Sequence, residues 1–300
     1  MFDSFYAMFI ALALSFFPVA VAIGIITFIK KQQRRNRVSP LTANLLRPYG
    51  YTLQESIHDL RLELFGKITE ILMTGLMLPL LLLIQAYFFN IKLSLTTWII
   101  IGIIGLIAFV FQIRKILKIV KALQQNKLGY SCEMAVGQEL EALVRPANHP
   151  YRLYHDIPFE NYNIDHLVIG PNGVFVVETK GRSKHIVEGS KQFKVIVEND
   201  SLIFPTHTER EPLEQVRRNV LSVKKWLQSS TGMDIPVAGI LVLPGWFVEL
   251  KQRAIDPYIL NASALPKVFP KLFAGALELG QINAIAYQVE QRVRDIKKDS

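Results

Sequence analysis

Long apolar runs alternate with short mixed patterns, and the two kinds of pattern occupy different parts of the chain. Residues 5–29 contain no charged side chain, and residues 71–89 and 95–113 are two further uncharged apolar runs. Because about 20 apolar residues cross a bilayer as a helix, these runs predict three transmembrane helices. After residue 127 the pattern changes to short strands and amphipathic helices, which predicts a domain of the α/β class.

The first apolar run has a second interpretation. A cleavable signal peptide would place Ala20 and Ala22 at its cleavage site. The basic residues that open a signal peptide are missing, and the apolar run continues past Ala22. We therefore expect a membrane span here.

Charge predicts how the chain crosses the membrane. Residues 1–127 hold 14 Lys and Arg against 5 Asp and Glu, whereas residues 128–300 hold 20 of each. The positive clusters follow the first and third runs, and the positive-inside rule places both in the cytoplasm. This predicts a multi-pass protein of the inner (plasma) membrane, with its N-terminus outside and its C-terminal domain cytoplasmic. Topology and anionic lipid headgroups account for the net charge of +9 without a nucleic-acid partner.

The predicted boundary between the two parts lies near Gly129. Residues 1–127 form the membrane region, in which residues 38–69 are expected to connect the first two spans through an amphipathic cytoplasmic helix. That helix lies on the inner leaflet or binds a partner, and its pattern fits both. The third helix is expected to end at Gly129, and residues 128–300 form the cytoplasmic domain.

Charged residues interrupt the most apolar hairpin of this domain, "IDHLVIGPNGVFVVETK" at residues 164–180. Its Gly-Pro-Asn-Gly turn predicts that Gly170 faces Gly173. In that register Asp165 faces Glu178, with about 5 Å between their Cβ atoms, and Lys180 projects from the same face.

Two facing carboxylates repel each other, and burial makes the repulsion costlier. A divalent cation would stabilise the pair, because hard cations bind carboxylate oxygens. A metal ion beside a lysine is also an arrangement that can catalyse phosphodiester hydrolysis. A buried Asp–Lys–Glu cluster without any chemistry is the alternative, and the pattern does not separate the two.

These residues resemble the core of the nuclease-related domain, a branch of the PD-(D/E)xK nuclease superfamily. The resemblance runs from about residue 137 to about residue 244 and implies a mixed sheet flanked by helices. It implies that Asp165 and Glu178 bind Mg²⁺ or Mn²⁺ and that Lys180 assists the nucleophile. Glu139 on the preceding helix is implied as a further metal ligand.

The resemblance also extends to the helix after the strands. There it implies a catalytic role for Gln215, with Asn219 one turn later as a substrate contact. The family often has Asn after its Glu-x-Lys motif, whereas this chain continues "GRSKH". Arg182 and Lys184 in that segment are candidate phosphate contacts, with solvated surface charges as the alternative.

Together these features predict a membrane-anchored, metal-dependent nuclease acting on nucleic acid, with DNA as the expected substrate. The alternative is a membrane-tethered scaffold that binds nucleic acid or protein without cleaving. The balanced charge after residue 127 favours the scaffold, because long nucleic acid is usually bound by basic surface. The sequence shows no phosphate-binding loop and no Gly-x-Ser-x-Gly motif, and its single cysteine excludes an intrachain disulfide.

Overall fold

The computed structural model divides the chain into two compact units. The first comprises residues 1–43 and 62–120, and the second comprises Asn44–Arg61 and Lys121–Ser300. The predicted first span, residues 5–29, and the start of the predicted connector lie mostly outside the described residues. The structure describes residues 17, 21–22, 24–29, 31–32, 45–90, 94–146, 149–184, 186–187, 190–251 and 256–294.

Two long helices carry the second and third apolar runs. They are α2 (Tyr51–Phe88) and α3 (Leu95–Glu141), and each contains an 18-residue window of high mean hydropathy, 2.0 and 2.2, with none of the window buried. Both helices are long and apolar enough to cross a membrane. In the first unit the Gln112 amide donates a hydrogen bond to Thr74 Oγ1 at 3.5 Å.

Both helices are longer than the sequence pattern predicts. α2 starts at Tyr51, so the helical part of the predicted connector and the second apolar run form one helix. α3 continues to Glu141, and the prediction that it ends at Gly129 is wrong. A Cβ at Gly129 would lie 3.1 Å from Leu53 Cδ1, so this glycine permits close packing of α2 and α3 within the second unit.

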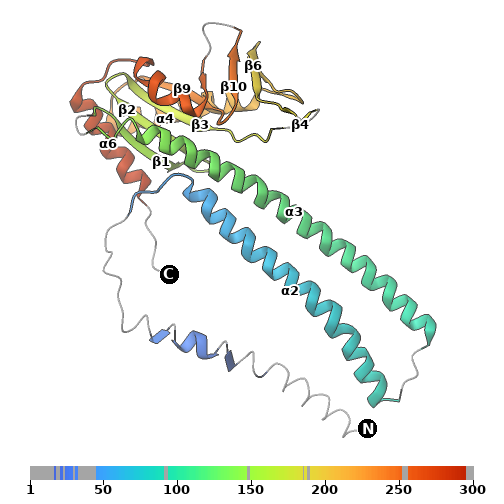
Figure 1. Ribbon diagram of the computed structural model, residues 1–300. Helices are drawn as coiled ribbons and strands as arrows, with labels where there is room; N and C mark the ends of the chain where they lie inside the picture. Colours follow the sequence, from blue (N-terminus) through green and yellow to red (C-terminus); the bar gives the residue numbers. More distant parts are fainter. Residues whose placement is uncertain are drawn as a thin grey trace. The chain divides into compact units, whose positions relative to one another are not determined.

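The second unit contains a five-stranded mixed sheet in the order β1-β2-β3-β9-β11 (Figure 1). Neighbours from β1 to β3 are antiparallel, whereas β3 with β9 and β9 with β11 are parallel. This confirms the predicted mixed sheet. The strands are β1 (Arg152–Pro158), β2 (Asn163–Gly170), β3 (Gly173–Thr179), β9 (Val237–Val242) and β11 (Tyr258–Leu260).

A smaller four-stranded sheet has the order β10-β6-β7-β8. Its strands are β10 (Phe247–Leu250), β6 (Lys194–Glu198), β7 (Ser201–Ile203) and β8 (Thr208–Glu209). A third sheet pairs β4 (Ile186–Val187) with β5 (Ser190–Lys191). The remaining helices are α4 (Glu211–Thr231), η1 (Ala262–Ala264), α5 (Leu265–Val268), η2 (Phe269–Lys271) and α6 (Leu279–Val293).

Helices cover both faces of the five-stranded sheet. On one face, α4 and α6 pack on a cluster that includes Leu167 and Val176. On the other, the end of α3 packs on a cluster that includes Phe175 and Val177. Alternate residues of β3 therefore enter different cores, which explains why this strand is apolar at nearly every position.

Residues 45–52, which lead into the first turn of α2, belong to the second unit. The buried carboxylate of Asp156 accepts hydrogen bonds from Thr52 Oγ1 at 2.8 Å, Asn163 Nδ2 at 3.2 Å and Arg47 Nη1 at 3.3 Å. The backbone N–H of Arg47 also donates to Val293 O. The second unit is therefore assembled from two separated stretches of the chain.

A histidine pair lies between β1 and β2. His155 faces His166, and their Nδ1 atoms are 2.8 Å apart, so one ring donates a hydrogen bond to the other. Burial lowers the pKa of His155 to about 4 and that of His166 well below its usual value. The fold therefore holds both rings neutral near neutral pH.

This pair predicts acid sensitivity. Between pH 6.5 and about 4, unfolded His155 binds a proton that the folded protein does not bind, so stability falls as pH falls. At about pH 4.5 the free energy of unfolding should be about 2 kcal/mol lower than at neutral pH because of His155. The His155→Gln variant should lack this contribution to the loss. Chemical unfolding of the detergent-solubilised full chain, followed by tryptophan fluorescence, measures the difference. Equal losses in both proteins would contradict the prediction.

Candidate functional site

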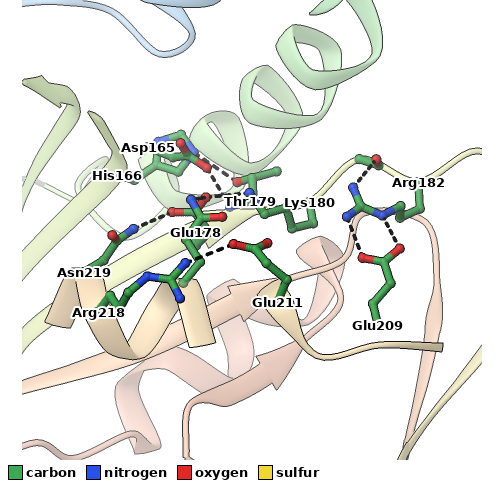
Figure 2. A network of polar contacts seen from close by, with 12 residues as sticks. Asp165, His166, Glu178, Thr179, Lys180, Arg182, Glu209, Glu211, Arg218 and Asn219 are labelled. Carbon is green, nitrogen blue, oxygen red and sulfur yellow. Dashed lines mark hydrogen bonds and ion pairs between the residues drawn. The ribbon is translucent and has the colours of Figure 1, made fainter. Parts of the chain in front are cut away.

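The two carboxylates of the hairpin lie on one face of the sheet. Gly170 pairs with Gly173 and His166 with Val177, which confirms the predicted register. Continued by one residue, this register places Asp165 opposite Glu178, and cross-strand partners share a face. Asp165 Oδ2 accepts a hydrogen bond from the Thr179 backbone N–H at 2.7 Å (Figure 2). The hairpin therefore brings both acids together at the end of β3.

Three side chains hold Glu178 in place. Lys180 Nζ and Gln215 Nε2 donate to its Oε1 at 2.9 and 2.7 Å, and Asn219 Nδ2 donates to its Oε2 at 2.9 Å. Gln215 and Asn219 are four residues apart, so one face of α4 carries both. The structure thus brings Asp165, Lys180, Gln215 and Asn219 together around Glu178, as the resemblance implied.

The carboxylates are disfavoured as anions. Burial raises the pKa of Asp165 well above its usual value, and the charges of Glu178 and Glu133 raise it further. Burial also raises the pKa of Glu178, although Lys180 and Asn219 partly offset this effect. Burial opposes the charge of Lys180, yet the Glu178 carboxylate outweighs it and the pKa of Lys180 is raised. The site contains more negative charge than its own cations neutralise.

An acid that the sequence pattern did not single out joins this group. Burial raises the pKa of Glu133 on α3 to about 8, with the charges of Asp156 and Glu178 adding to the effect. Glu133 lies on the same helical stripe as buried Val136 and Leu140. A charge on an otherwise apolar stripe is the signal that could have identified it, had α3 been predicted to continue through Gly129.

Glu139 lies on the same helix as Glu133. It is six residues further along and about 120° around the helix axis, and it is half-buried. The electrostatic contribution of α3 to Asp165 and Glu178 comes from Glu133. The metal-binding role of Glu139 stays a prediction.

Arg182 and Lys184 lie on the segment that leaves the site. The Arg182 guanidinium binds the Glu209 carboxylate through Nε at 2.7 Å and Nη2 at 2.6 Å (Figure 2). Lys184 is exposed, with its ammonium 5.8 Å from the centre of the Trp246 ring. A phosphate would have to displace Glu209 to bind Arg182, whereas Lys184 already faces solvent.

The donor chemistry fits a hard divalent cation. In the described part of the chain, no group of three or more His, Cys, Asp or Glu side chains is arranged to hold a metal ion. Asp165 and Glu178 are two facing carboxylates whose pKa values are raised chiefly by burial, and the charges of Glu178 and Glu133 add to the effect at Asp165. Mg²⁺ is commonly bound by one or two carboxylates together with water and substrate phosphate. Two acids therefore suffice for such a site.

Comparison with known proteins identifies this region. The family model of the nuclease-related domain (NERD) matches residues 128–244. This confirms the resemblance drawn from the hairpin, and the matched region begins nine residues earlier than that resemblance did. Neither the curated proteins nor the solved structures compared with the chain gave a match. The matched region includes Glu133, Asp165, Glu178 and Lys180.

Proposed function

From the nuclease-related domain at residues 128–244, we propose that this protein is a divalent-metal-dependent nuclease that hydrolyses phosphodiester bonds, with DNA as the expected substrate. The observation that carries the proposal is the facing pair of Asp165 and Glu178 with Lys180 bound to one of them. A buried acid pair with raised pKa values, beside a lysine, is the charge arrangement expected at a functional site.

Each residue has a distinct task in this proposal. Asp165 and Glu178 would hold Mg²⁺ or Mn²⁺, and Glu133 would act electrostatically on Asp165 from α3. The bound ion would supply a nucleophile by lowering the pKa of water and would polarise the phosphate. Lys180 stabilises negative charge that develops on the phosphoryl oxygens. Gln215 and Asn219 fix the Glu178 carboxylate, so their proposed role is positioning.

We further propose that the apolar helices anchor this domain in the inner membrane. The apolar windows of α2 and α3 support the anchor, and the Lys- and Arg-rich segments support a cytoplasmic domain. A reporter fused after Ser300 should be active in the cytoplasm. A reporter active only in the periplasm would contradict this orientation.

A tethered binding module that does not cleave is the second candidate function. It is favoured by the complete hydrogen bonding of Glu178, whose two oxygens accept three bonds from protein donors. Such a satisfied network also occurs in proteins without catalysis. In this case the domain would keep the fold and bind nucleic acid or protein.

Cleavage by the full chain in lipid nanodiscs separates the two candidates. Plasmid and labelled oligonucleotides are incubated with Mg²⁺, with Mn²⁺ or with EDTA. Metal-dependent cleavage that EDTA abolishes is expected. Intact substrates under every condition, with protein that binds them, would establish the binding module instead.

A matched pair of variants tests which acid of α3 takes part. Glu133→Gln is expected to lower cleavage by at least about 10-fold, because Glu133 acts electrostatically on the acid pair. If Glu133 is the acid of α3 that takes part, Glu139→Gln should retain activity within about 2-fold, because Glu139 lies about 120° around the helix axis from Glu133. Initial cleavage rates at saturating Mn²⁺ measure both. The reverse order of effects would assign the ligand role to Glu139.

A further inference from the structure

Two exposed aromatic rings lie at adjacent strand ends of the smaller sheet. Phe193 is 57% exposed and Phe247 is 55% exposed. The backbone N–H of Phe247 donates to Phe193 O at 2.7 Å, and Phe247 pairs with Lys194 across β10 and β6. β10 is an edge strand of its sheet. Phe247 and Lys194 are paired positions and share one face of the sheet, whereas Phe193, one residue before Lys194, projects toward the opposite face. An exposed aromatic ring beside a lysine at a sheet edge is a feature of interaction surfaces.

This surface is connected to the catalytic lysine by a short segment. From Lys180 to Lys184 an extended chain spans at most about 14 Å. The segment lies beside the start of β10. Trp246, the residue before that strand, donates from Nε1 to Arg182 O at 3.1 Å, and Lys184 lies over the Trp246 ring. At about 3.4 Å per stacked nucleotide, roughly four nucleotides cover that distance. A strand cleaved at the site therefore has its next few bases within reach of Phe247.

The charges beside the rings favour a polyanion. Lys194 and Lys251 both bind the Glu249 carboxylate, at 2.7 and 2.5 Å, and Glu198 also acts on Lys251. Exposed Lys184 adds a positive charge near the start of β10, where its ammonium lies 5.8 Å from the centre of the Trp246 ring. Lysines that flank exposed rings supply phosphate contacts next to stacking platforms, which is the arrangement used to bind single strands.

We infer that Phe247, with Lys194 on the same face and Lys184 beside the start of β10, forms a stacking edge that binds unpaired nucleotides, so that the substrate is single-stranded nucleic acid or an unpaired end. The inference rests on the proposed nuclease function and specifies its substrate class. Bases inside a duplex already stack on each other and offer no free faces to protein rings. Unpaired bases of any sequence do, which predicts binding without sequence preference.

Binding in the absence of cleavage tests the inference. The full chain in nanodiscs is titrated, in EDTA, into a labelled single-stranded oligonucleotide of about 12 nucleotides or into the matching duplex, and fluorescence anisotropy is followed. Wild type should bind the single strand at least about 10-fold more tightly than the duplex, and Phe247→Ala should lose about 10-fold for the single strand alone.

Phe273→Ala is the matched control. Phe273 is 64% exposed and lies beside the β2–β3 turn, because Ala274 N donates to Asn172 O there. The seven residues of β3 separate that turn from the site by about 20 Å. This variant should bind both oligonucleotides like wild type.

The outcomes separate the stacking edge from the nuclease activity. Metal-dependent cleavage with equal affinity of wild type and Phe247→Ala for the single strand would overturn the stacking edge and leave the nuclease standing. Selective loss of single-strand binding in Phe247→Ala without any cleavage would support the edge and contradict the nuclease. Duplex binding as tight as single-strand binding would overturn the inferred substrate class.

Discussion

Replacing Lys180 by alanine is expected to lower the rate of metal-dependent cleavage by about 10²–10³-fold, the usual cost of removing one preorganised electrostatic group from an active site. The Lys180 ammonium lies 2.9 Å from Glu178 Oε1, and its side chain keeps 20% of its surface exposed. It therefore contacts a carboxylate of the site and still faces the solvent from which a phosphate arrives. Single-turnover cleavage with saturating Mn²⁺ measures the effect.

Lys224→Ala is the control for this experiment. Lys224 lies on α4 and forms an exposed ion pair with Asp234 at 3.3 Å. Exposed pairs contribute little, so this variant should cleave and unfold like wild type. Full activity in a folded Lys180→Ala protein would remove the lysine from the proposed mechanism.

Replacing Asp156 by alanine is expected to lower the free energy of unfolding by about 3–5 kcal/mol, because a buried ion pair would lose its anion. The Asp156 side chain is 5% exposed and accepts hydrogen bonds from Arg47, Thr52 and Asn163. Its φ of 48° adds a cost for alanine, since Asp and Asn adopt this conformation more readily. Chemical unfolding of the full chain measures the loss.

Asp200 provides a comparison at similar backbone geometry. Its φ is 56° and it pairs with Arg217, but its side chain is 52% exposed. Loss of this ion pair in Asp200→Ala should therefore lower the free energy of unfolding by less than about 1 kcal/mol. The cost of placing alanine at a positive φ is common to both variants. Similar losses of unfolding free energy in both variants would mean that burial of the Asp156 network adds nothing to stability.

The Asp156 network also defines what must be present for the domain to fold. Arg47 and Thr52 lie before the apolar run of α2, and both bind a residue of β1. A fragment that starts at residue 128 would lack them. We therefore specify the full chain in every experiment above.

Local patterns predicted the hairpin and the relative placement of its charged residues. The Gly-Pro-Asn-Gly turn fixes which residues pair, and strand alternation then decides which side chains share a face. Asp165, Glu178 and Lys180 follow from these two rules alone.

The parts that were missed depend on contacts between distant segments. Glycine is a weak helix former, so the local pattern predicts a helix end at Gly129. In the structure it packs against Leu53, a residue 76 positions earlier. Extending α3 through Gly129 brings Glu133 to the site, and that acid was missed for the same reason. Nothing local in residues 45–52 indicates their packing on β1 either.

Binding of Mn²⁺ to the full chain, followed by electron paramagnetic resonance, tests most directly whether the facing acids hold a cation. Wild type is expected to show a saturable site that Mg²⁺ competes for. Asp165→Asn and Glu178→Gln should each weaken it by at least about 10-fold, while Asp200→Asn should leave it unchanged. Equal Mn²⁺ affinity in wild type and in the folded Asp165→Asn and Glu178→Gln variants would contradict the shared cation site.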